Sequence, residues 1–552
     1  MKSARLFNTQ ILALLLTLSA PVIAEEASDG LSRGGFRVET AVPPDDDLLR
    51  YGAVIGEIYI ETHNIFDPSR EGEDRLLYNL ANRLHKTTNH KVIERKLLFE
   101  SGDPYDPRVL RETARYLRSQ DYLFDAEIQP IRYRGNRVDI LVSTRDVWTL
   151  SVGAGLARSG GANTFQINIE ESNFLGTGRQ LDLKYSDDPD RSSRRFRFVD
   201  TALFGSRTEL RLWYSANSDG HRRIFDLERP FYALDTRWGA GTKLVSEDRQ
   251  EKLYSQGEVT ERFQHERTMA EIRGGRSRGL IDGRASRWFV GYTYQEDRFR
   301  SNDQTSEGFV LPVARTLSYP WIGFETVEDE YLVTQNLDQL ARPEDLNLGT
   351  ELRGRLGWSS GAWGGDKDQA IFSLEVRSGW TSQNDQTLLL SGHAAGRWGT
   401  DGHENVTLGG EVRYFLRTFG RHRLQVALRL DAAWNLDPER QLLLGGDNGL
   451  RGYPRRFQDG DRRFLLSLEH RFYTDWELFN LVNAGAAVFV DAGRAWYDDV
   501  GGGHGVLKDI GFGLRLSSSR SSKGTMVHLD VAYPLDGDTD KVQWLVTTRE
   551  SF

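Results

Sequence analysis

The sequence predicts a transmembrane antiparallel β-barrel preceded by a small α+β domain, and three observations lead to this fold class. Short runs of alternating polar and apolar residues follow one another over residues 148–552, without helical periodicity. The chain is rich in residues that barrels use in turns and at membrane interfaces, with 55 Gly, 20 Tyr and 13 Trp. After Ala24 no apolar run reaches the length of about 18 residues that a transmembrane helix needs. The mean hydropathy of −0.53 fits a soluble protein and also a β-barrel, in which only every second strand residue faces lipid.

Residues 1–24 have the features of a signal peptide. Lys2 and Arg5 give a positive start, and Ile11 to Leu18 forms a short apolar core. Val22-Ile23-Ala24 places small residues at the −3 and −1 positions of a cleavage site. The apolar core is too short for a membrane anchor. We therefore expect the mature chain to be exported.

Composition and motifs argue against several kinds of chemistry. The chain contains no Cys, which excludes disulfides and thiol catalysis. Its formal net charge of −9 argues against nucleic acid as a partner. His504 lies among glycines without partners for a catalytic or metal site, and no Gly-x-Ser-x-Gly elbow falls on a strand-to-helix turn. We expect no enzyme activity, no cofactor and no metal.

Two segments separate the signal peptide from the barrel. Residues 25–50 are polar, with a Pro-Pro pair before three aspartates, and predict a flexible linker. Residues 51–147 predict a small α+β domain in the order β-α-α-β-β. A β-rich run begins at Val54, Asp106-Pro107 predicts the start of a helix, and Arg134-Gly135-Asn136 joins two final strands. About 95 residues are enough for a core of its own.

A set of short motifs within residues 51–147 has the spacing of a known family. They are Lys86-Thr87, Val92-Ile93-Glu94-Arg95, Gly102-Asp103-Pro104-Tyr105-Asp106, Leu110, Leu117 and Tyr122-Leu123-Phe124. On these residues the segment resembles a POTRA (polypeptide-transport-associated) domain. The helix-like stretch from Pro68 to Leu84 departs from the family pattern, which leaves open one elaborated domain or one domain with a truncated neighbour. An ordinary periplasmic α+β domain is the alternative.

Residues 148–552 predict the barrel strands. The clearest period-2 runs are 180–185, 209–214, 423–431 and 527–533. One apolar and one charged face would suit a soluble sandwich, or a membrane barrel with a wet lumen. The undivided length, and tight turns such as 204–207 alternating with longer polar loops such as 247–252, favour the barrel. At one strand roughly every 20 to 25 residues the segment holds roughly 16 to 20 strands. The run count favours 20, depending on whether Lys252 to Arg278 is one strand or two.

Leu442 to Phe464 interrupts this alternation. Within it, Gly445-Gly446-Asp447-Asn448-Gly449-Leu450-Arg451-Gly452-Tyr453-Pro454 combines turn signals with a single cation. The segment is either a plain surface loop or a loop that folds back into a barrel and docks Arg451 there.

A strand downstream carries a suitable partner for Arg451. In the run from Ala487 to Trp496, alternation places Phe489, Asp491 and Gly493 on the face opposite the valines, so Asp491 faces the lumen if the valines face lipid. A charge away from bulk water requires a partner of opposite charge. Gly493 removes side-chain bulk beside Asp491 and would admit the loop.

The two motifs together, Gly-Gly…Leu-Arg-Gly-Tyr and Phe-x-Asp-x-Gly-x-Ala-Trp, resemble those of the BamA/TamA superfamily of outer-membrane assembly and translocation barrels. The resemblance covers roughly residues 51–552 and implies POTRA domains followed by a 16-stranded barrel, with the hallmark Arg in the sixth external loop and five strands after it. It implies that Leu450, Arg451, Gly452 and Tyr453 form the motif of a loop docked in the lumen. It further implies that Phe489, Asp491 and Gly493 form the docking strand.

The two ends of the barrel carry further expectations. Trp544, Val546 and the terminal Phe552 resemble the C-terminal signal that outer-membrane barrels present to their assembly machinery. By the same resemblance, the first strand (149–158) and the last (542–552) form a weak seam that opens laterally. Ser151, Gly153 and Gly155 in the first strand would weaken packing there.

The resemblance implies a role in insertion or translocation of polypeptides at the outer membrane of a Gram-negative bacterium. The POTRA-like domain would lie in the periplasm, receive a client polypeptide and pass it to the barrel. The implied partners are the unfolded or secreted client, outer-membrane lipid and periplasmic assembly factors. A passive pore or transporter and a structural surface antigen are the alternatives.

Overall fold

A computed structural model describes residues 42–66, 82–83, 85–340, 343–382, 385–479, 481–498, 505–519, 526–536 and 541–549. The expected signal peptide, most of the expected linker, most of the Pro68 to Leu84 stretch, His504 and Phe552 lie outside these residues. Within the described part of the chain, no helix is both long enough and apolar enough to cross a membrane.

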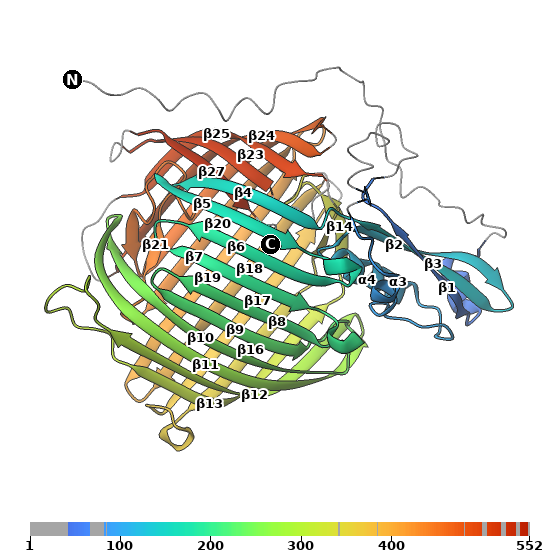
Figure 1. Cartoon of the computed structure of the whole chain (residues 1–552), viewed down its shortest axis with the longest axis horizontal. Helices are drawn as coiled ribbons and strands as arrows, with labels where there is room; N and C mark the ends of the chain where they lie inside the picture. The colour runs from blue at the N-terminus through green and yellow to red at the C-terminus, as the bar shows by residue number, and fades with distance from the viewer. Residues whose placement is uncertain are drawn as a thin grey trace. The chain divides into compact units, whose positions relative to one another are not determined.

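Residues 150–549 form a closed barrel of 20 strands, each antiparallel to its neighbours (Figure 1). In chain order the strands are β4 (Leu150–Ser159), β5 (Ala162–Glu171), β6 (Arg179–Asp187), β7 (Ser192–Asp200), β8 (Glu209–Asn217), β9 (Gly220–Arg229), β10 (Trp238–Ser255), β11 (Glu258–Ile281), β12 (Arg284–Arg300), β13 (Arg315–Glu328), β16 (Glu351–Ser359), β17 (Gln369–Thr381), β18 (Gln386–Gly399), β19 (Gly402–Arg417), β20 (Arg423–Trp434), β23 (Arg462–Leu478), β24 (Val482–Trp496), β25 (Leu507–Ser518), β26 (Met526–Pro534) and β27 (Gln543–Arg549). Three 3-10 turns lie between strands, η1 (Phe174–Gly176), η2 (Leu203–Gly205) and η3 (Gly361–Trp363).

The strand number corrects one expectation. The 16 strands implied by resemblance are wrong, because the described barrel has 20, the upper end of the range that the alternating runs allowed. A motif in one loop does not determine how many hairpins precede it, whereas each further pair of alternating runs adds a hairpin and widens the barrel. The stretch from Lys252 to Arg278 belongs to two strands, because the chain turns at Gln256 and Gly257, both with positive φ (53° and 83°).

Side chains alternate between the two faces of the barrel wall. In β4, Val152 is 70% exposed on the outer face, whereas a Cβ on Gly153 would meet the inward side chain of Asn168 on β5. In β27, Trp544 is 63% exposed and Leu545 is 3% exposed. The outer face is apolar and the inner face carries many ion pairs, an arrangement that places apolar side chains toward lipid and charged ones toward water.

Two pairs of short strands depart from the barrel sheet. β14 (Tyr331–Gln335) and β15 (Pro343–Asn347) form a hairpin between β13 and β16. β21 (Leu442–Leu444) and β22 (Gln458–Gly460) pair within the loop between β20 and β23. Each pair forms a separate two-stranded sheet, so barrel pairing passes directly from β13 to β16 and from β20 to β23.

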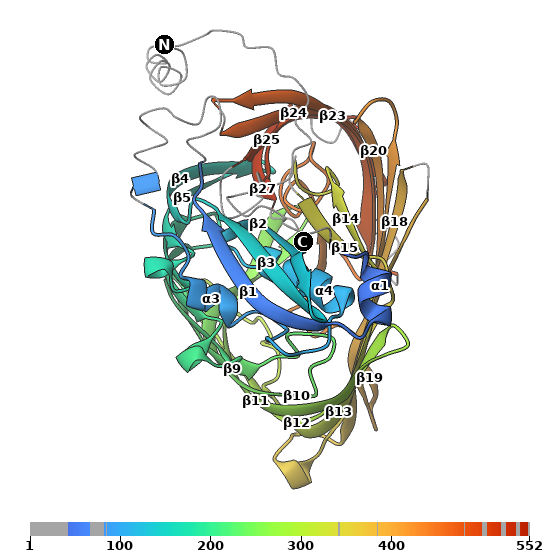
Figure 2. The ribbon, with the colours of Figure 1, turned by 90° about the vertical axis from the view of Figure 1, so that its right-hand side faces the viewer.

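The segment before the barrel forms a three-stranded sheet with helices. Its elements are α1 (Asp45–Arg50), β1 (Val54–His63), α3 (His90–Glu94), α4 (Pro107–Arg118), β2 (Leu123–Arg134) and β3 (Arg137–Asp146). The sheet order is β1-β3-β2, with β1 parallel to β3 and β2 antiparallel to it (Figure 2). α4 begins where expected, because the Asp106 side chain accepts the backbone N–H of Arg108 and Pro107 takes the first helical position.

One expectation for this segment is wrong at its edge. Residues 45–50, which we expected in a flexible linker, form α1, and Leu48 is fully buried in the core with Ile55, Ile93 and Leu117. Burial of one leucine contributes about 2 kcal/mol, which is enough to fix a short helix against a preformed core. The three aspartates of this segment predicted a polar linker, and the sequence pattern gave no sign that Leu48 packs into the core.

Candidate functional site

The loop between β20 and β23, residues 435–461, turns into the barrel, and we call it the inward loop. Leu450 and Tyr453 are fully buried and pack with Leu444, Ala495 and Leu507. The plain surface loop considered from the sequence therefore does not describe these residues. β21 and β22 hold the two ends of the loop together through pairs such as Leu442 with Gly460.

A compact turn places the tip of the inward loop. The Asn448 side chain accepts the N–H of Gly445 (2.7 Å) and donates to the carbonyl of Leu443 (2.6 Å). The N–H of Leu450 bonds to the Gly445 carbonyl (3.0 Å). A Cβ on Gly446 would lie 2.2 Å from the Tyr453 carbonyl oxygen, so only glycine fits there. The Asp-Asn-Gly turn signal thus serves to bring the two sides of the loop close together.

Arg451 is 5% exposed and makes charged contacts on several sides. Its guanidinium donates to both carboxylate oxygens of Asp491, from Nε at 2.7 Å and from Nη2 at 2.9 Å. Nη1 donates to Glu469 at 2.7 Å and lies 3.6 Å from Asp530. The guanidinium carbon lies 3.3 Å from the centre of the Phe489 ring. Bidentate and charge-assisted bonds of this kind are the strong ones, and the ring supplies a cation–π contact on one face.

The carboxylates around Arg451 belong to a larger buried network. Glu469 also accepts from Arg471 (2.8 Å) and Arg515 (2.9 Å), and Arg515 donates to Asp530 (2.5 Å). All of these side chains are 5% exposed or less. Buried charges are tolerated when each has a partner of opposite sign, which is the case for these arginines and acids.

Glu469, Arg515 and Asp530 were absent from the sequence-based site. Their strands do alternate, and each lies on the inward face by register: Glu469 opposite Phe489, and Arg515 opposite His528 next to Asp530. Period-2 alternation could have placed these charges in the lumen. It could not have shown that they meet, because contact across several strands depends on register.

The remaining motif residues contact the wall through their backbone or hydroxyl groups. The N–H of Gly452 donates to Asp509 (3.0 Å), and a Cβ on Gly452 would lie 2.6 Å from the Cβ of Asp509. The Tyr453 hydroxyl donates to Asp536 (2.8 Å) and accepts the N–H of Lys508 (3.2 Å). On the docking strand, a Cβ on Gly493 would meet Leu444 (3.0 Å), so Gly493 makes room for the base of the inward loop rather than its tip.

The barrel closes at a weak junction, which we call the seam. Among the described residues, β27 and β4 share one residue pair, Val546 with Arg158. The neighbouring wall hairpin of β4 with β5 is paired over ten residues. Trp544 and Val546 lie on the outward-facing side of β27. Phe552 lies outside the described residues. Because main-chain bonds fasten neighbouring strands, this junction is the least fastened place in the described part of the wall.

In the described part of the chain, no group of three or more His, Cys, Asp or Glu side chains is arranged to hold a metal ion. The contacts that the described residues make in the site are ion pairs and hydrogen bonds. They can hold a loop in place, and they can release the loop if the pairs exchange partners.

The sequence matches no protein-family model and no curated protein. Among solved structures it is similar to BamA from Haemophilus ducreyi lacking POTRA domains 1-3, with 14% identity, 90% of this chain and 84% of that chain covered, and a TM-score of 0.38. It is also similar to CdiB from Escherichia coli, with 12% identity, 89% and 76% covered, and a TM-score of 0.46. A third is the FrpB iron transporter from Neisseria meningitidis, with 9% identity, 78% and 85% covered, and a TM-score of 0.39. All three TM-scores lie below 0.5.

Proposed function

We propose that this protein belongs to the BamA/TamA superfamily and takes part in inserting or translocating polypeptides at the outer membrane of a Gram-negative bacterium. The observation that carries the proposal is Arg451, buried on an inward loop and held by Asp491 and Glu469 in the wall. A passive pore needs no such lock inside its lumen. A protein that alternates between a closed and an open state needs such a contact, because ion pairs can be broken and formed again.

The segment before the barrel suits the capture of an unfolded client. We assign residues 51–147 as a POTRA-like domain in the periplasm. Its sheet order β1-β3-β2 leaves β2 as an edge strand with 12 residues. An extended polypeptide can add to such an edge through main-chain hydrogen bonds, which tolerate many sequences.

A cavity next to this domain offers a path for the client. It has a volume of about 760 Å³ and is lined by α4, by the β14–β15 hairpin and by the barrel wall, with Arg118, Glu344 and Arg287 among its residues. Mixed charges on several sides suit a polypeptide with polar backbone better than an apolar solute. From there the client would reach the seam, where only one residue pair must break among the described residues. The sequence carries no nucleotide motif, so the driving free energy is that of client folding.

Comparison of outer-membrane proteomes tests the proposal. A deletion strain should lose one or more outer-membrane or secreted proteins, and the wild-type chain should restore them. Arg451→Ala should fail to restore them. Arg429→Ala is the matched control, because Arg429 is a lumen arginine paired with Glu411 (2.8 Å) and makes no described contact with the inward loop. If the deletion strain loses no protein, the assembly function is wrong and a passive pore or surface antigen remains.

A charge exchange tests the lock itself. Arg451→Glu places a fourth acid beside Asp491, Glu469 and Asp530 and should abolish complementation, since an unpaired buried charge costs about 3–5 kcal/mol. Adding Asp491→Arg should restore part of the activity. Full restoration is not expected, because Glu469 and Asp530 still face position 451. A double variant no better than the single one would show that the contact is not functional.

A further inference from the structure

The inward loop is bonded to both sides of the seam. On the side of β25–β27, Gly452 donates to Asp509 and Tyr453 to Asp536. On the side of β4, the Ser159 hydroxyl donates to the Gly446 carbonyl (2.5 Å), and the N–H of Arg455 donates to the Gly160 carbonyl (3.1 Å). Ser159 ends β4 and Gly160 belongs to the turn into β5. One loop therefore spans the junction that β27 and β4 fasten weakly.

The contact with the β4–β5 turn is between backbones. A Cβ on Gly160 would lie 2.3 Å from the Arg455 nitrogen, and a Cβ on Gly446 would lie 2.6 Å from the Gly160 Cα. Glycine at both positions permits this approach, and Gly160 has a positive φ of 55°. The inward loop and the β4–β5 turn therefore pack backbone against backbone, and their contact does not depend on side chains alone.

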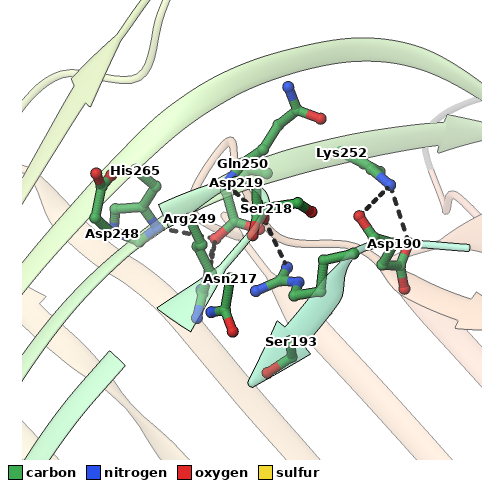
Figure 3. Close-up of polar contacts among 12 residues, drawn as sticks. Asp190, Ser193, Asn217, Ser218, Asp219, Asp248, Arg249, Gln250, Lys252 and His265 are labelled. Atoms are coloured by element: carbon green, nitrogen blue, oxygen red, sulfur yellow. Dashed lines mark hydrogen bonds and ion pairs between the residues drawn. The ribbon is translucent and has the colours of Figure 1, made fainter. Parts of the chain in front are cut away.

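A carboxylate in the loop between β6 and β7 holds the inward loop on this side. Asp190, in the loop between β6 and β7, accepts from Arg456 through Nη1 (3.0 Å) and Nη2 (2.6 Å) and from Arg455 (3.3 Å). Lys252 on β10 also contacts Asp190 at 3.3 Å, as Figure 3 shows. Among the described residues, Asp190 is the sole carboxylate outside the inward loop that is paired with Arg455 or Arg456. Their other acid partner, Asp447, belongs to the inward loop.

The surroundings of Asp190 strengthen this attachment. The Arg456 guanidinium lies over the Tyr254 ring of β10 at 4.5 Å, and Gln441 at the start of the inward loop exchanges two 2.8 Å bonds with the backbone of Tyr254. Burial acts to raise the pKa of Asp190, but the hydrogen bond and charge of Arg456, with Lys252 and Arg455, outweigh it and hold the pKa well below its usual value. The carboxylate is thus ionised at any physiological pH.

We propose that the inward loop acts as a strap that closes the seam from the extracellular end, and that Asp190 is the positioning residue that holds the strap on the β4 side. β4 can leave β27 only after Arg455 and Arg456 leave Asp190 and the loop leaves Gly160. The proposal deepens the proposed function and rests on it for the role of seam opening in client release. The strap itself is a property of the protein without client.

Distance measurements on the purified full chain in lipid nanodiscs test the strap. The Cys-free sequence allows spin labels at two introduced cysteines, Ala154→Cys on the outer face of β4 and Lys541→Cys just before β27. Pulsed electron paramagnetic resonance then reports the separation across the seam. Asp190→Arg, which repels Arg455 and Arg456, should raise the ratio of open to closed seam roughly tenfold or more, as expected for loss of charge-assisted bonds. Asp190→Asn should raise it less.

Two further variants separate positioning from general damage. Asp187→Asn removes an exposed acid on the neighbouring end of β6, which has no described contact with the loop, and should leave the distances unchanged. Adding Arg455→Asp and Arg456→Asp to Asp190→Arg should restore the closed distance, which a merely structural effect would not do. An unchanged distance in Asp190→Arg, or no recovery in the exchanged variant, would overturn the strap. Neither result bears on the proteome test, so the strap and the proposed function fail separately.

Discussion

At the residue scale, Arg451 is the centre of the site because it satisfies carboxylates from more than one strand at once. Its planar fork reaches Asp491 through two bonds and Glu469 through a third, a geometry that lysine cannot reproduce. Removing Arg451 would leave the buried carboxylates of Asp491 and Glu469 with fewer cationic partners. We therefore attribute its importance to what its loss leaves unpaired, rather than to the strength of any single bond.

Gly452 should be intolerant of any side chain. In Gly452→Ala the added Cβ would lie 2.6 Å from the Asp509 Cβ and 3.1 Å from the Pro534 nitrogen, so the loop or two wall strands must move. We expect a loss of about 1–3 kcal/mol in stability and a lower temperature of barrel unfolding on semi-native gels. Gly361→Ala is the control, because a Cβ there meets nothing within 4 Å. Equal unfolding temperatures for the two variants would contradict the close packing.

The Asp190 contact should not respond to pH in the physiological range. A carboxylate whose folded-state pKa is depressed stabilises the folded arrangement fully above its unfolded pKa, about 3.9, and loses that contribution as pH falls through the lower folded value. Arg455, Arg456, Lys252 and Tyr254 face it. The spin-label distances should be equal at pH 8 and pH 5, and should lengthen only below about pH 4. Opening at pH 5 would show that another group holds the strap.

At the element scale, the β14–β15 hairpin reaches across the barrel. The hairpin leaves the wall between β13 and β16, but side chains on β19 and β23 hold its turn. Arg413 donates to Asp338 (2.9 Å), Arg471 to the Leu337 carbonyl (2.6 Å) and Tyr473 to the Asn336 carbonyl (2.9 Å). A segment tied to strands so far from its origin must lie over the lumen at that end.

Removing the hairpin should therefore increase ion flow through the barrel. Glu330 and Leu348 at its base are already hydrogen-bonded (2.8 Å), so residues 331–347 can be replaced by a short turn without separating β13 from β16. We expect a higher single-channel conductance in planar bilayers, because the lumen loses an obstruction. Shortening the loop 301–314, which joins β12 to β13, is the control. Unchanged conductance after removal of the hairpin would mean that another segment limits the channel.

At the scale of the whole molecule, the described residues form a closed barrel with an apolar exterior, a charged interior and one sparsely paired junction, the seam. Wall strands elsewhere share long ladders, so separating them would break many main-chain bonds at once. In the proposed function the barrel would open at the seam, where the fewest described pairs must break, and in the proposed strap the inward loop would control that opening.

A covalent bond across the seam should block function reversibly. Val546 and Arg158 lie opposite each other in the antiparallel pair, where Cα atoms are about 4.5–5.5 Å apart, within the range a disulfide requires. The variant with Arg158→Cys and Val546→Cys should lose complementation under oxidising conditions and regain it with a reducing agent. A cysteine pair at Leu212 and Phe225, opposite each other in the intact β8–β9 ladder, is the control and should have no effect. Full activity of the locked seam variant would exclude lateral opening.

Much of the fold could be predicted because its signals are local. Alternation in runs such as 423–431 predicted strands that the structure contains. The run count favoured the upper end of 16 to 20 strands, and the described barrel has 20 where the family resemblance gave 16. Asp106-Pro107 predicted the start of α4. α1 was missed, because its one buried side chain, Leu48, has a partner core that is distant in sequence.

By itself, the sequence determined that a glycine-rich loop carries Arg451 and that Asp491 lies on the charged face of a strand, because both follow from residue type and a two-residue period. The tertiary structure alone decided that Glu469 and Asp530 share that arginine, and that Asp190 reaches Arg456 from a distance of 266 residues. These contacts depend on which strands are neighbours and on the register between them. Register is a sum of many main-chain pairings around the barrel, and no local pattern contains it.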